Sequence, residues 1–60
     1  MIYDLKKFAA TLESRASRIA DEARGDPDAI RQGERYRYAA VLIIVAGALR
    51  IQAARGEVAA

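Results

Sequence analysis

The chain of 60 residues contains no cysteine, no histidine and no tryptophan. Without cysteine it cannot form a disulfide, and without histidine it lacks the commonest metal-binding side chain. Its eight carboxylates are scattered among ten lysines and arginines and show no calcium-loop spacing. A chain of this length hides only about 60% of the surface that it exposes when unfolded. We therefore expect no metal or other cofactor, and association with another chain is the stabilising device that remains.

The chain also carries little excess charge of either sign, and its formal net charge is only +2. The sequence pI of about 9.4 follows from two surplus cations in a chain without histidine, so it is weak support for an anionic partner. The first seven residues contain Asp4, Lys6 and Lys7, and no apolar run follows them. We therefore expect no signal peptide and a cytoplasmic location.

The single proline lies in the most specific local motif, the sequence GDPD at residues 25–28. We expect Gly25 to end a first helix in the left-handed conformation, Asp26 to cap a second helix, and Pro27 to occupy its first turn. This predicts one all-α domain, an antiparallel two-helix hairpin. The predicted bounds are a helix at about 2–24, a tight turn at 25–27, a helix at about 27–55 and a frayed tail at 56–60.

The first predicted helix is amphipathic, with an apolar stripe on one side and most charges elsewhere. Within the stripe, leucine or isoleucine alternates with alanine, and each type recurs every seven residues. This repeat predicts coiled-coil-like packing in which the alanines let two backbones approach closely. The stripe consists of Ile2, Leu5, Phe8, Ala9, Leu12, Ala16, Ile19, Ala20 and Ala23.

The second predicted helix contains an uncharged run at residues 38–49, where it has two apolar faces. A hairpin can cover only one of them. Small residues also recur every seven positions from Gly33 to Ala54, and each internal glycine costs about 1 kcal/mol relative to alanine, which predicts close contact with a further helix. The first apolar face contains Ile30, Tyr38, Val41, Leu42, Val45, Ala48 and Leu49, and the second apolar face contains Tyr36, Ala40, Ile43, Ile44, Gly47 and Ile51.

Two other structures for the uncharged run are considered. Residues 41–45 are rich in β-branched side chains and could form a buried strand, although the chain offers no partner strand. A membrane helix is the other possibility, but twelve residues span only about 18 Å, whereas the hydrocarbon layer is about 30 Å thick. Flanking arginines that extend toward the lipid headgroups would lengthen it, so a membrane-associated subunit is the second alternative function.

Basic and aromatic residues interleave at residues 31–38, as in many proteins that bind phosphates and stack on unpaired bases. The candidate contacts are Arg31, Arg35 and Arg37, with Lys6 and Lys7 as further cations. A helical projection spreads the three arginines around the helix, which favours an ordinary solvated surface. A dimeric RNA- or DNA-binding regulator is therefore the first alternative function.

No nucleophile, base or carboxylate pair has a catalytic spacing, and no glycine-rich phosphate loop is present. We also expect the chain to be too small for a pocket of a few hundred cubic ångströms, so it should not be an enzyme. The expected function is a small protein that pairs into a homodimeric four-helix bundle and binds and inhibits a target protein, as phage or mobile-element proteins of this size do. The second apolar face is the predicted interface with the partner or the second copy.

Overall fold

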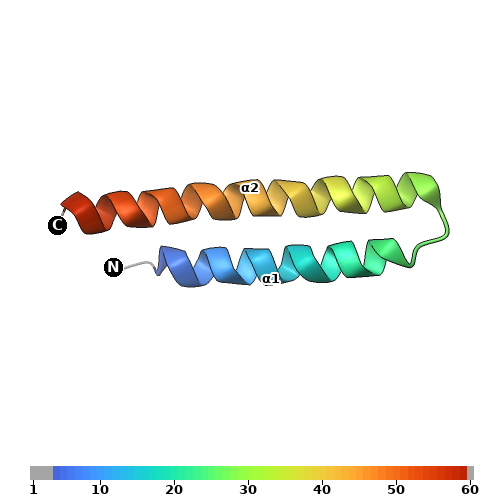
Figure 1. Ribbon diagram of the computed structural model, residues 1–60, viewed down its shortest axis with the longest axis horizontal. Helices are drawn as coiled ribbons and strands as arrows, with labels where there is room; N and C mark the ends of the chain where they lie inside the picture. Colours follow the sequence, from blue (N-terminus) through green and yellow to red (C-terminus); the bar gives the residue numbers. More distant parts are fainter. Residues whose placement is uncertain (1–3, 60) are drawn as a thin grey trace.

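The described part of the protein consists of two α-helices joined by a short turn (Figure 1). The computed structural model describes residues 4–59, with side chains described as far as Gly56. Helix α1 spans Leu5–Arg24 and α2 spans Ala29–Ala59. The helices run antiparallel along a molecule of 49 × 15 × 13 Å. The all-α prediction is confirmed, and the strand considered for residues 41–45 is wrong, because these residues lie within α2.

Helix α1 begins at Leu5, later than the predicted start at residue 2. Asp4 precedes the helix and caps it, because its Oδ1 accepts a hydrogen bond from the backbone N–H of Lys7 at 2.9 Å. Ile2, the first member of the predicted stripe, lies outside the described residues. The helix therefore starts at a capping side chain, although the apolar pattern in the sequence begins earlier.

The turn differs from its prediction at Gly25. This residue has φ −91° and ψ 0°, so the expected left-handed conformation is wrong. Instead, the N–H of Gly25 donates to the carbonyl oxygen of Glu22 at 3.2 Å, and the N–H of Asp26 donates to that of Ala23 at 3.0 Å. These tight bonds satisfy carbonyl groups at the end of α1 without a left-handed residue.

Helix α2 begins at Ala29 because Asp28, and not Asp26, caps it. Oδ1 of Asp28 accepts from the backbone N–H groups of Ile30 at 3.0 Å and Arg31 at 3.2 Å. Asp26 accepts from the backbone N–H of Asp28 at 2.9 Å instead, which closes the turn around the proline. The turn therefore covers residues 25–28, one residue more than predicted.

Helix α2 continues through Gly56 to Ala59, so the predicted end near Arg55 is wrong. One internal glycine costs a helix only about 1 kcal/mol, and no proline follows it. The helix has 31 residues against 20 in α1. Its C-terminal end consequently extends beyond the start of α1, as the difference in predicted lengths implied (Figure 1).

The helices meet along alanines. The buried apolar residues described are all alanines, and the leucines and isoleucine between them on α1 are half-buried. The alanines of the repeat therefore lie at the contact between the helices, as predicted. Alanine permits close packing but buries little surface, and no large side chain in the described region is fully buried. The buried set is Ala9, Ala16, Ala23, Ala39 and Ala46.

Among the described residues, ion pairs join α2 to α1 and to the turn. Arg50 Nε donates to Glu13 Oε2 at 3.0 Å, joining α2 to α1. Arg31 Nε donates to Asp26 Oδ2 at 2.7 Å, joining α2 to the turn. The hydrogen bonds from the arginines lower the pKa values of both carboxyl groups, and the backbone N–H of Asp28 adds to the effect at Asp26. Both acids are therefore more easily ionised in the folded chain.

These lowered pKa values predict that acid destabilises the hairpin. A carboxyl group with a lowered folded-state pKa contributes stability that is fully present above its unfolded pKa, about 4, and is lost as the pH falls through the folded pKa. We expect a thermal midpoint that is flat between about pH 5 and 8 and falls below about pH 4. Circular dichroism melts of the Glu13→Gln/Asp26→Asn variant should show a smaller decline. Asp21→Asn, which removes a pair within α1, is the control.

Candidate functional site

The side of α2 that packs on α1 lies between the two predicted apolar faces. Its buried members, Ala39 and Ala46, belong to neither face. Neither apolar face is covered along its whole length, because the small alanine side chains permit a closer approach than a row of branched ones. This packed line consists of Gln32, Arg35, Ala39, Leu42, Ala46, Leu49 and Ala53.

The second apolar face, predicted as the interface, is largely left open by the hairpin. Ile44 is 71% exposed, Ile43 is 50% exposed and Tyr36 is 41% exposed. Ile51 and Ala40 are also exposed, and Gly47 is half-buried. A Cβ atom added at Gly33 or Gly47 would meet nothing within 4 Å. No contact within the described chain therefore explains either the apolar side chains or the glycines.

Helix α2 carries more apolar surface than a core helix leaves exposed. The segment Ala29–Gly56 is long and apolar enough to cross a membrane by length and composition, a criterion that core helices of soluble proteins also meet. Core helices are mostly buried, whereas only 11% of the apolar window of α2 is buried. Tyr38, Val41 and Val45 of the first apolar face are likewise exposed. The hairpin thus leaves most of this surface uncovered.

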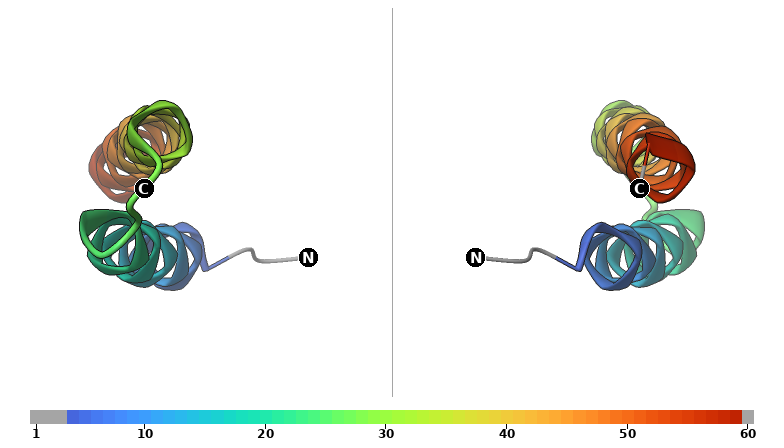
Figure 2. Two further views of the ribbon diagram at one scale, coloured as in Figure 1. Left: turned by 90° about the vertical axis from the view of Figure 1, so that its right-hand side faces the viewer. Right: turned by 90° about the vertical axis from the view of Figure 1, so that its left-hand side faces the viewer.

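The outer side of α1 is polar. Lys7, Ser14, Arg15 and Arg18 share a shallow groove there, and all four residues are exposed. The end-on views in Figure 2 show one pair of helices, each of which has the side away from its neighbour open. The outer side of α1 is formed by polar and charged side chains that water solvates well. The uncovered apolar surface is therefore concentrated on α2.

A second line with heptad spacing runs along α2 on the side opposite the packed line. Its steps alternate between three and four residues, as in a coiled-coil seam. Charged residues stand at both ends and apolar residues lie between them. Among the described residues, none of its charged side chains forms an ion pair. This outer seam consists of Glu34, Arg37, Val41, Ile44, Ala48, Ile51 and Arg55.

The three arginines considered for nucleic-acid contacts are not brought together. Arg31 is hydrogen-bonded to Asp26, and Arg35 Nη1 lies 3.6 Å from Glu22 Oε2. Arg37 belongs to the outer seam on the other side of the helix. Two of the three positive charges are therefore compensated by nearby acids, which weakens their attraction for phosphate.

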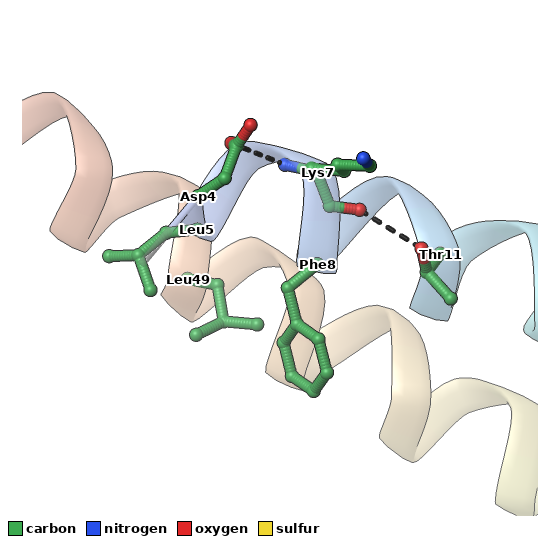
Figure 3. A pocket seen from close by; sticks show the side chains of 6 residues that line it. All are labelled: Asp4, Leu5, Lys7, Phe8, Thr11 and Leu49. Carbon is green, nitrogen blue, oxygen red and sulfur yellow. Dashed lines mark hydrogen bonds between the residues drawn. The ribbon is translucent and has the colours of Figure 1, made fainter. Parts of the chain in front are cut away.

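An open groove of about 560 Å³ lies near the start of α1 (Figure 3), so the expectation that no pocket of this size exists is wrong. Its apolar lining comes from Leu5 and Phe8 of α1 and Leu49 of α2. The Thr11 hydroxyl donates to the carbonyl oxygen of Lys7 at 3.1 Å, and Asp4 serves as the helix cap. The lining therefore presents no nucleophile beside a base. The part of the chain that is described also contains no cluster of three side chains suited to a metal ion.

Comparisons of the chain with protein-family models, with curated proteins and with solved structures gave no match. No family is therefore assigned. The feature that most needs a functional explanation is the exposed apolar surface of α2, because α1 covers only the packed line.

Proposed function

We propose that the protein is a non-enzymatic interaction module that binds a target protein through the second apolar face of α2 and inhibits it. The exposure of this face carries the proposal, since Ile43 and Ile44 are at least half exposed on an otherwise well-formed helix. An amphipathic helix can place such a face in a groove of a partner. Tyr36 at its edge is of a residue type that often dominates binding energy.

The same exposed apolar surface of α2 supports self-association into a homodimer of four helices. Burying the remaining surface of a half-exposed aliphatic side chain stabilises a complex by about 1 kcal/mol. Several such side chains lie on α2, whereas the outer side of α1 is polar. The two copies of α2 therefore lie at the centre of the proposed four-helix dimer, with the two copies of α1 outside.

A cytoplasmic location is proposed in preference to a membrane span. Helix α1 packs along α2 and carries Lys7, Arg15 and Arg18 on its outer side. Insertion of α2 across a bilayer would move those charges into hydrocarbon or separate the alanine-lined helices. Either change is costly, because charged side chains are strongly disfavoured at the bilayer centre.

The proposal is tested by retaining a target protein from an extract of the source cells on the immobilised chain. We expect retention by the wild-type protein, loss with Ile43→Asp, and no change with Ser14→Asp on the polar side of α1. The purified target should then lose activity when the wild-type chain is added. Binding that is unaffected by Ile43→Asp would contradict the assigned face. Binding that disappears on nuclease treatment would favour the nucleic-acid alternative, and binding only to lipid vesicles would favour the membrane alternative.

A further inference from the structure

We infer that a second copy of this chain docks antiparallel on the outer seam of α2. The inference rests on the proposed function, which makes the uncovered side of α2 an interface. It adds that a second copy of the chain binds there and in which orientation. The outer seam is a second heptad line on a helix whose first heptad line already packs on α1. Two such lines on opposite sides predict two helix neighbours.

The charges of the outer seam make it complementary to itself in one orientation. Glu34 lies near the N-terminal end of the seam and Arg55 lies at its C-terminal end. In an antiparallel pair, Glu34 of each copy lies opposite Arg55 of the other, and the apolar segments overlap from Val41 to Ala48. In a parallel pair, Glu34 meets Glu34 and Arg55 meets Arg55, so like charges face each other at both ends.

The same pairing determines the register. With Glu34 opposite Arg55 of the second copy, Val41 lies opposite Ala48 and Ile44 lies at the twofold axis. A large residue then faces a small one on either side of the axis, as in the hairpin itself, where leucines alternate with alanines. In this register Arg37 lies opposite Gln52 and beside Ile51 of the other copy. Shifting the register by one heptad would break both Glu34–Arg55 pairs and place Arg55 opposite Val41, or Glu34 opposite Ala48.

The size and character of the surface suit a second copy. The seam from Glu34 to Arg55 is about 32 Å long at about 1.5 Å per residue, so the contact would extend over most of the molecule. Homodimer interfaces are more apolar than ordinary protein surface, and the middle of this seam is wholly apolar, with Ile44 71% exposed in the single chain. An isologous pair buries this surface twice, once on each copy.

This arrangement divides the second apolar face, because Ile44 and Ile51 pack against the second copy and the remainder of the face is left for a target. Tyr36, Ala40 and Ile43 lie on the flank of α2, beside the outer seam and not within it. They would stay accessible in the dimer. The dimer would therefore present two copies of the flank to target proteins.

The first test uses charge reversal and light scattering to measure mass. Wild type is expected at twice the chain mass of 6.5 kDa. Glu34→Arg and Arg55→Glu should each weaken self-association about tenfold or more, because two attractive pairs per dimer become repulsive. The double variant Glu34→Arg/Arg55→Glu should restore wild-type affinity, and so should an equimolar mixture of the two single variants. Arg18→Glu, on the outer side of α1, is the matched control and should stay dimeric.

The second test measures orientation without changing the seam. Ala54→Cys introduces the only thiol in the chain, and a spin label there should be about 30 Å from its symmetry mate in the antiparallel dimer. A separation near 10 Å would indicate parallel helices and overturn the inference. If both single charge-reversal variants stay dimeric, Glu34 does not lie opposite Arg55 of the second copy. If the wild-type chain stays monomeric at millimolar concentration, a second copy does not bind to the outer seam. None of these results affects the retention of a target by Ile43, which tests the proposed function separately.

Discussion

Replacing Ala16 with leucine is expected to unfold the hairpin. Ala16 is 2% exposed on the buried line of α1, and the antiparallel register set by Glu13 and Arg50 places it near the level of Ala46, which is also buried. Overpacking a close contact costs about 1–3 kcal/mol, and occasionally more. A single core in so small a chain supplies only roughly 3–5 kcal/mol. The substitution therefore removes a large part of the free energy of unfolding.

Circular dichroism measures the result as a loss of helical signal and a fall in the thermal midpoint. The matched control is Ala10→Leu, which makes the same change at an exposed position on the same helix. Leucine and alanine have similar helix propensities, so the control should stay folded. If Ala16→Leu melts at the same temperature as Ala10→Leu, the helices do not meet along the alanines.

The two-helix fold follows directly from the sequence, but the details of its turn do not. The sevenfold alternation on α1 and the GDPD segment suffice to predict two antiparallel helices. The cap of α2 was misassigned because Asp26 and Asp28 can both accept backbone hydrogen bonds. In the structure the Asp26 side chain, 5% exposed, accepts hydrogen bonds from Arg31 and from the backbone N–H of Asp28, and Asp28 caps the helix.

The packed line of α2 was missed for a different reason. A projection that weights side chains by hydrophobicity favours isoleucine, valine and tyrosine, whereas the buried residues are alanines. Close approach of the backbones, and not the hydrophobicity of single side chains, selected the packed line. The repeat of Ala39, Ala46 and Ala53 every seven residues matches that of α1 and was available in the sequence as the signal. The exposure of Ile43 and Ile44 was anticipated, because a hairpin with two apolar faces on one helix must leave one of them open.

Replacing Ile44 with aspartate is expected to dissociate the proposed dimer while leaving a single hairpin partly helical. In the single chain Ile44 is 71% exposed, and surface substitutions of this kind usually change stability by less than about 0.5 kcal/mol. In the dimer the residue lies at the twofold axis, where two carboxylates would face each other without water or a cation. Burying unpaired charge costs at least several kcal/mol. The substitution should therefore strongly destabilise the dimer and barely change the stability of the single hairpin.

Light scattering should therefore give the chain mass of 6.5 kDa for Ile44→Asp at concentrations where wild type is twice as heavy. Because folding and association are linked, the wild-type thermal midpoint should rise with concentration, and that of the variant should not. Ile30→Asp is the matched control, since Ile30 is 76% exposed in the first turn of α2, where a negative charge favours the helix. If Ile44→Asp remains dimeric and melts like Ile30→Asp, the second copy does not use this side of α2, and the flank with Tyr36 and Ile43 becomes the surface to test for self-association.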